Sequence, residues 1–260
     1  MSLVVSDISS YGIIMVGDSA VTRKSNGNKS YHGGCVKVQF CKKSRIGFAI
    51  WGRADVGAIR MDQWLQNFVA NHTHDGENIV TVGERLATTL NAELAKSDNK
   101  YFRRGIQLSG YVGKTPVLYH VHSGHLNEEP HELRLYRDCP DDLGLSLERL
   151  HELIAGGSSF HLRNGRFQHF AALFKNVHDY SQTLKVILDT ELPPPDLKGR
   201  LEFYQMLVRF VAGVLRIAKQ DGSVNEDLSW VAFDCYGSLH ESYVALSIEP
   251  RQAAESVLEC

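Results

Sequence analysis

The sequence lacks closely spaced cysteines, a long uninterrupted hydrophobic run and a signal peptide. Its five cysteines are an odd number, are scattered, and form no C-x-x-C pair. A disulfide framework or a thiolate zinc site is therefore disfavoured, and a reducing compartment is expected. The most apolar later stretch, residues 207–218, is interrupted by Arg209 and Arg216 and is too short to cross a bilayer. The N-terminus has no basic region followed by a long apolar segment. These absences predict a cytoplasmic protein with no membrane partner.

The sequence also has little excess charge. The formal net charge is −2, and no basic block is interleaved with aromatic residues, so nucleic acid is not an expected partner. The hydrophobic share of 43% is ordinary for a globular chain, and 260 residues can build a sizeable core. No internal repeat or low-complexity tract divides the chain. We therefore expect one domain over residues 1–260, without a cofactor.

Hydrophobic patterning predicts strands and helices that arrive in blocks. Strands are expected at residues 3–5, 12–16, 35–40, 46–51, 106–112, 117–121, 132–136, 229–233 and 242–248. Helices are expected at residues 54–70, 80–96, 177–190 and 197–219. A polar, glycine-rich segment separates the second and third strands. Blocks of strands and helices favour a layered α+β fold over alternating βαβ units.

One block near the N-terminus resembles a known family. Residues 12–22, Gly-Ile-Ile-Met-Val-Gly-Asp-Ser-Ala-Val-Thr, are similar to the D-G-V-V-L-A-A-D-S-R-A-T segment of proteasome β subunits and to the matching segment of the bacterial HslV-type peptidase. Counting back from Asp18 by the family's fixed interval gives Ser2, where the family has its catalytic threonine. The resemblance implies an N-terminal nucleophile hydrolase with a four-layer α-β-β-α sandwich.

Later segments keep the family's order. Val36-Lys37-Val38 resembles the strand with the active-site lysine, and residues 47–55 resemble the segment that opens the first helix. Residues 108–119 are similar to the central hairpin. More weakly, Ser158 after two glycines and Asp221 resemble further active-site positions. Residues 125–150 and 160–200 are longer than in the minimal bacterial peptidase, which implies insertions.

The chemistry of such a site begins with Ser2. A serine hydroxyl needs a base, and the free α-amine of a chain terminus can serve, because its pKa lies near 7.7–8.0. Ser2 would thus supply nucleophile and base once Met1 is removed. By resemblance, Lys37 would stabilise the alkoxide, Asp18 would orient Lys37, and the Gly52 N–H would donate to the oxyanion. The resemblance assigns Thr22 and Gly52 to the substrate backbone, and Cys35, Ile50 and Ala54 to the first specificity pocket.

Other interpretations remain open beside this one. Gly17-Asp18-Ser19 resembles the GDS block of GDSL-type esterases. Those enzymes need an acid three residues before a histidine near the C-terminus, but Gly237 occupies that position before His240, so this alternative fails. His120 and His122 share a strand face, yet a metal site is not expected there. An inactive proteasome-like ring subunit and an amidase acting on a small amide both remain alternatives. The resemblance implies a peptide or unfolded protein as substrate and homo-oligomeric stacked rings, and it allows an ATP-dependent unfoldase as partner.

Overall fold

The computed structural model describes residues 3–25, 28–32, 34–96, 102–124, 129, 131–137, 145–165, 171–176, 192–217, 224, 226–236 and 239–242. Ser2, Asp221 and the helix expected at residues 177–190 lie outside the described residues. Within this part of the chain, no helix is both long enough and apolar enough to cross a membrane.

The first sheet has five antiparallel strands and is built around an N-terminal hairpin. Its strands are β1 (Leu3–Ser9), β2 (Gly12–Asp18), β12 (Phe160–Gly165), β13 (Leu228–Phe233) and β14 (Leu239–Ser242), in the order β12-β1-β2-β13-β14. The register places Val4 opposite Gly17 and Leu228 opposite Asp18. The two ends of the sheet are therefore well defined: Asp18 and Leu3 lie at one end, and the β1–β2 turn lies at the other.

The second sheet also has five antiparallel strands. They are β5 (Val38–Cys41), β6 (Ile46–Gly52), β9 (Arg104–Val112), β10 (Thr115–His122) and β11 (Arg134–Arg137), in the order β11-β10-β9-β6-β5. Two short hairpins stand apart, β3 (Val21–Ser25) with β4 (Asn28–His32) and β7 (Asp55–Val56) with β8 (Ile59–Arg60).

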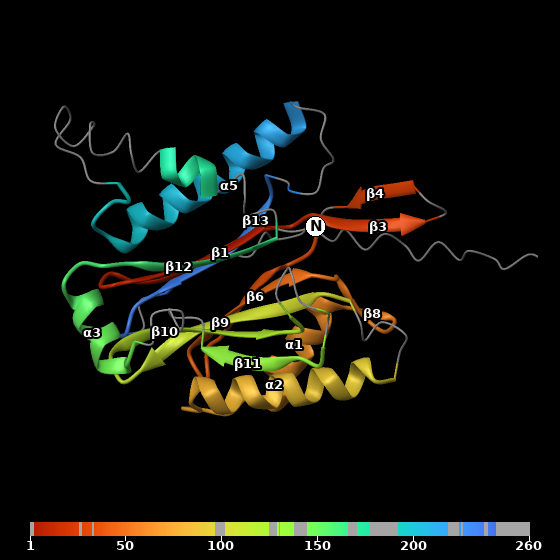
Figure 1. Ribbon diagram of the computed structural model, residues 1–260, viewed down its shortest axis with the longest axis horizontal. Coiled ribbons are helices and arrows are strands. Elements are labelled where there is room, and N and C mark those ends of the chain that lie inside the picture. Colours follow the sequence, from red (N-terminus) through yellow and green to blue (C-terminus); the bar gives the residue numbers. More distant parts are fainter. Residues whose placement is uncertain are drawn as a thin grey trace, which may run out of the picture.

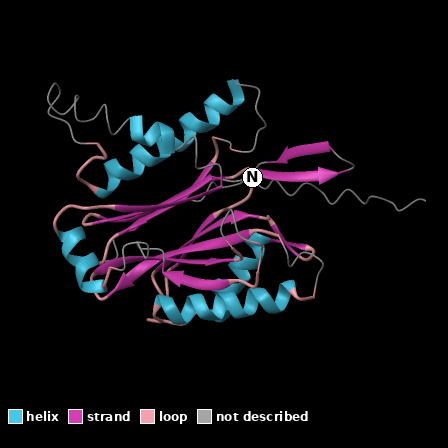
Figure 2. Cartoon of the chain, viewed as in Figure 1, coloured by secondary structure: helices cyan, strands magenta, loops and turns pink. Residues whose placement is uncertain are grey.

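Helices cover the outer faces of the two sheets (Figures 1 and 2). The long helix α5 (Leu197–Ile217) lies on the first sheet, while α1 (Met61–His72) and α2 (Ile79–Leu94) lie on the second. A shorter helix, α3 (Leu147–Ala155), lies at one end and leads into β12. The mixed helix and strand content with antiparallel sheets agrees with the α+β prediction.

The alternation of side chains along β1 explains why both faces of the first sheet are buried. Val4 and Ile8 belong to the core shared with the second sheet. Leu3 and Val5 belong to a separate core, packed against α5. Because successive residues of a strand point to opposite faces, the apolar residues of this one strand serve both cores.

Several sequence predictions need correction. The helix expected at residues 54–70 begins only at Met61, because residues 55–60 form the β7–β8 hairpin around Gly57, whose φ is +60°. The polar segment at residues 23–34 contains most of the β3–β4 hairpin, which was not expected. Neither α3 nor β12 was predicted. The helices α2 and α5 and the β9–β10 pair were predicted close to their observed bounds, whereas β1 continues to Ser9, beyond the strand expected at residues 3–5.

Candidate active site

The geometry centres on the carboxylate of Asp18, which is completely buried at the end of β2. Its Oδ1 accepts a hydrogen bond from the Leu3 backbone N–H at 2.7 Å and another from Lys37 Nζ at 2.8 Å. Its Oδ2 accepts from the Ala20 backbone N–H at 2.9 Å. Lys37 is itself only 3% exposed, so the ion pair is shielded from water. Asp18 therefore ties the start of β1 to a buried ammonium group.

Lys37 reaches this position because the two sheets approach closely at Gly17. A Cβ atom at Gly17 would lie 3.3 Å from Lys37 Cβ and 3.2 Å from Val38 Cγ2. The Lys37 carbonyl accepts from the Ile50 N–H at 2.9 Å, which joins the lysine to β6. The Val38 N–H donates to Ser229 Oγ on β13 at 2.9 Å. The lysine segment is thus held by both sheets, and no motif in the sequence predicts the hydrogen bond to Ser229.

The first turn of α1 holds the segment that carries Lys37. The Val36 N–H donates to Asp62 Oδ2 at 3.0 Å, and Arg60 Nη2 donates to the Gly34 carbonyl at 2.6 Å. Arg60 and Asp62 also form an ion pair with each other. The sequence did not predict this link between α1 and the Lys37 segment, because an acid in the first turn of a helix is common and carries no specific signal.

The residues expected to line a specificity pocket lie on segments next to Lys37. Cys35 is buried two residues before the lysine, and Ile50 is buried in β6 directly opposite it. Ala54 is half-buried, and its carbonyl accepts from the N–H of Met61 at the start of α1. Burial raises the pKa of the Cys35 thiol to about 12, with Asp62 adding to the effect. Cys35 is therefore a neutral thiol at physiological pH and not a competing nucleophile.

Thr22 and Gly52 were expected to hold a substrate backbone. Thr22 lies in β3 opposite Tyr31, and nothing is described of its side chain. Gly52 ends β6 with a φ of +83°, a conformation that favours glycine. A Cβ atom there would also lie 2.5 Å from the Arg103 carbonyl oxygen. Only glycine fits at this bend, because a side chain would collide with the neighbouring backbone. The oxyanion role of Gly52 stays a prediction.

Ser158 is not brought to this site. It follows α3, where its N–H donates to the Leu153 carbonyl at 2.9 Å as part of the helix-ending turn. It precedes β12, in which Phe160 lies opposite Ile8, whereas Leu3 lies opposite Gly165 at the other end of β1. Ser158 therefore lies at the end of the first sheet remote from Asp18. The glycine-serine resemblance placed it wrongly, because a Gly-Gly-Ser sequence also suits a helix C-terminus.

The two histidines of β10 have roles in packing and hydrogen bonding. His120 Nε2 accepts from Trp51 Nε1 at 2.6 Å, and this contact passes over Gly105, where a Cβ atom would collide with both rings. His122 stacks on Tyr136 with ring centres 4.3 Å apart, and its Nδ1 accepts from the Gly124 N–H. Among the described residues, no group of three or more His, Cys, Asp or Glu side chains could hold a metal ion.

Comparison with known proteins identifies the fold. Neither a protein-family model nor a curated protein sequence matches the chain significantly. Among solved structures, the chain is similar to the Anbu (Gly-1) mutant from Hyphomicrobium sp. strain MC1, with 10% identity and a TM-score of 0.51, over 90% of this chain and 82% of that one. Another match is Anbu (ancestral beta-subunit) from Yersinia bercovieri, with 12% identity and a TM-score of 0.46, over 89% and 80%.

The Hyphomicrobium match shows that the chain shares the fold of that Anbu protein. It does not reach the finer HslV-type assignment that the sequence suggested. At 10% identity the likeness carries the fold alone, so the activity has to be argued from the residues.

Proposed function

We propose that the chain is a proteasome-like N-terminal nucleophile hydrolase, in which Ser2 cleaves peptide bonds once it is the first residue of the mature chain. The arrangement of helices and sheets is then the four-layer α-β-β-α sandwich of these hydrolases. The observation that carries the proposal is the pair of hydrogen bonds to Asp18 Oδ1, one from the Leu3 N–H and one from Lys37 Nζ. The nitrogen bonded to Ser2 is thereby held on the same oxygen as the buried ammonium group.

The charges suit a nucleophile at this point. The Lys37 ammonium favours the neutral form of a nearby α-amine, because a second positive charge beside it would be repelled. It also stabilises the developing alkoxide of a nearby hydroxyl, because that charge is negative. Asp18 keeps the lysine oriented and compensates its charge in a buried place. Neither residue needs to move during the reaction, which is the condition for electrostatic stabilisation of a transition state.

The reaction then follows in balanced steps. The Ser2 Oγ attacks the substrate carbonyl carbon while the α-amine takes the hydroxyl proton, and the Gly52 N–H donates to the oxyanion. The C–N bond breaks as the α-ammonium returns the proton to the leaving amine, which leaves an ester on Ser2. Water, activated by the same amine, hydrolyses the ester and restores the serine. No step needs a metal or a cofactor.

The wider setting is also part of the proposal. We infer that the chain forms a homo-oligomer of stacked rings in the cytoplasm. Its substrate would be a peptide or unfolded protein, and an ATP-dependent unfoldase would be a compatible partner. The inactive ring subunit and the amidase of small amides are the alternatives that the following experiment separates.

The test is the intact mass of purified native protein before and after incubation with a peptide epoxyketone, which reacts with a hydroxyl and a free α-amine together. The expected result is a chain without Met1 that gains one inhibitor mass, with no gain in a Ser2→Ala variant. A chain that keeps Met1 and gains no mass contradicts the proposal and favours the inactive ring subunit. Labelling without hydrolysis of any peptide, but with turnover of small amides, favours the amidase.

A further inference from the structure

A cavity lies at the end of the sheets remote from Asp18. It has a volume of about 330 Å³, within the range of small-molecule sites. Four segments meet there: the β1–β2 turn, the β9–β10 turn, the second half of α3 and the residues that follow β13. Since Gly12 and Asp18 are the two ends of β2, the cavity is separated from the candidate active site by the length of that strand, roughly 20 Å.

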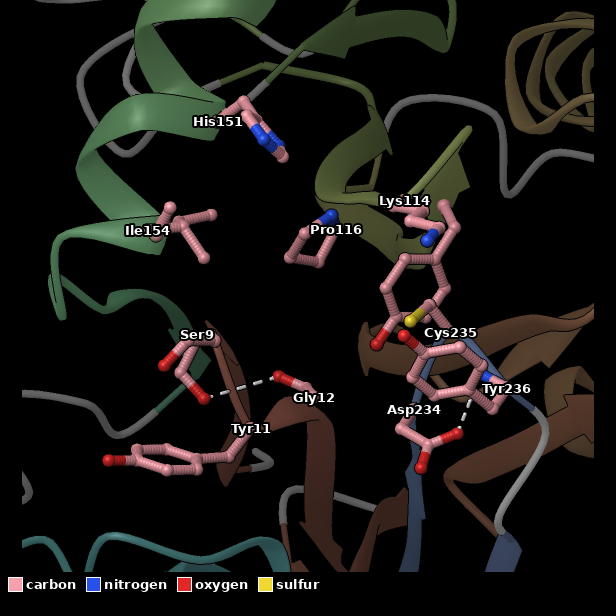
Figure 3. A pocket seen from close by; sticks show the side chains of 13 residues that line it. Ser9, Tyr11, Gly12, Lys114, Pro116, His151, Ile154, Asp234, Cys235 and Tyr236 are labelled. Atoms are coloured by element: carbon pink, nitrogen blue, oxygen red, sulfur yellow. Dashed lines mark hydrogen bonds between the residues drawn. The ribbon is translucent and has the colours of Figure 1, made fainter.

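The cavity has an apolar floor and aromatic walls (Figure 3). Pro116 and Ile154 are buried residues that line it, from β10 and α3 respectively. The phenol of Tyr111 donates to the Phe233 carbonyl at 3.3 Å, and burial raises its pKa, so this ring remains neutral. Tyr11 and Tyr236 also line the cavity and are 41% and 79% exposed. Flat rings beside an apolar floor suit an aromatic group, which packs favourably on other rings.

Charged groups of both signs surround this apolar floor. Lys114 lies in the β9–β10 turn, with its ammonium 5.8 Å from the centre of the Tyr236 ring. Asp234 follows β13, and its Oδ1 accepts from the Tyr236 N–H at 2.8 Å, which fixes the carboxylate. His151 of α3 lines the opposite wall, with its Nδ1 3.0 Å from Thr115 Oγ1. A ligand with a single charge would lie near a side chain of the same sign as well as one of the opposite sign. A ligand with both charges can pair each of them with a side chain of the opposite sign.

We propose that this cavity binds a free aromatic α-amino acid. The side chain would lie on Pro116 and Ile154, the carboxylate would face Lys114, and the ammonium would face Asp234. The proposal is independent of the hydrolase activity, because it involves none of the residues around Asp18.

The test measures binding of four related probes to the full chain. They are L-phenylalanine, 3-phenylpropionate without the ammonium, phenethylamine without the carboxylate, and N-acetylphenylalanine, which represents the last residue of a peptide. Cys235 reports occupancy, since it lines the cavity and is half-buried, whereas Cys35 and Cys41 are buried. Its alkylation rate is followed by peptide mass mapping. L-Phenylalanine is expected to protect Cys235 with a dissociation constant on the order of 0.1–1 mM, as fits a ligand this small.

Two variants identify the charge partners. Lys114→Met is expected to weaken L-phenylalanine about tenfold and to leave phenethylamine unchanged, since only the former has a carboxylate. Asp234→Asn keeps the oxygen that accepts from the Tyr236 N–H, and it is expected to weaken L-phenylalanine but not 3-phenylpropionate. Lys198→Met, an exposed lysine on α5, is the matched control.

The outcomes are decisive in either direction. Stronger protection by L-phenylalanine than by the other three probes, weakened in the two variants as described, supports the proposal. Equal protection by all four probes would show an apolar cavity without charge recognition and would overturn it. Protection by N-acetylphenylalanine as strong as that by the free amino acid would assign the cavity to a peptide terminus, and an absence of protection would remove the site.

Discussion

Asp18 and Lys37 form a pair in which each charge depends on the other. Both side chains are almost fully buried, and their contact is 2.8 Å. Removing one partner of a buried ion pair leaves an uncompensated charge and typically costs about 3–5 kcal/mol. At the scale of single residues, stability and catalysis therefore have to be separated in any test of this pair.

A Lys37→Met variant keeps the length of the side chain and removes its charge. We expect it to lower the free energy of unfolding by about 3–5 kcal/mol and to lower the rate of epoxyketone labelling by at least about 10²-fold. Adding Asp18→Asn should recover part of the stability, because the buried carboxylate is no longer charged, without recovering labelling. Urea unfolding and labelling rates measure the two effects. A double variant that regains labelling would contradict the assigned role of Lys37.

Ser2→Thr tests the nucleophile itself. A threonine has a β-methyl group that restricts rotation about χ1, so its hydroxyl spends more time in one orientation. We expect turnover of a fluorogenic peptide by the Thr variant to exceed that of the wild type, at equal loss of Met1 by intact mass. A Thr variant that is fully processed and slower would count against a rotamer limit in the wild-type serine.

At the scale of elements, the sequence predicted what local pattern encodes and missed what tertiary contacts decide. The strand β2 and the helix α2 follow from continuous or periodic apolar residues. The start of α1 was placed too early, because the β7–β8 hairpin depends on a turn at Gly57 and not on hydrophobic period. The Asp18–Lys37 pairing came from resemblance and is present, whereas Ser158 is remote, since its local Gly-Gly-Ser sequence matches a helix end equally well.

The link between α1 and the lysine segment gives an element-scale prediction. Asp62→Ala removes the acceptor of the Val36 N–H and the partner of Arg60. Leaving the half-buried Val36 N–H without its acceptor and Arg60 without its carboxylate should cost about 1–3 kcal/mol of unfolding free energy. Because Val36 adjoins Lys37, epoxyketone labelling should also slow. Asp75→Ala, in an exposed turn, is the matched control and should change neither quantity. Normal labelling in a destabilised Asp62→Ala variant would show that this link between α1 and the Lys37 segment supports the fold alone.

At the scale of the whole molecule, two separate apolar cores share the first sheet. One lies between the sheets and under α1 and α2, and the other lies under α5. The second core contains a polar cluster: Asp7 is fully buried, accepts from the Tyr204 phenol at 2.7 Å, and pairs with Arg200 at 3.2 Å. Burial raises the pKa of the Asp7 carboxyl even though Arg200 opposes the change. The attachment of α5 is therefore sensitive to charge.

His161 of β12 makes this attachment dependent on pH. Burial, together with the nearby positive charges of Arg163 and Arg200, lowers the pKa of its imidazole to about 4 from an ordinary value of 6.5. Between pH 6.5 and 4 the unfolded chain binds a proton that the folded chain does not, so stability falls as the pH falls through this window. The full difference corresponds to about 3 kcal/mol.

A His161→Gln variant removes this proton and keeps a polar side chain of similar length. We expect the wild type to lose about 3 kcal/mol more than the variant when the pH is lowered from 7 to 4, measured by urea unfolding at each pH. The other titrating groups are common to both proteins, so the difference between the two pH profiles isolates the imidazole. Parallel profiles would mean that the imidazole has the same pKa in the folded and unfolded chains, which would contradict the prediction.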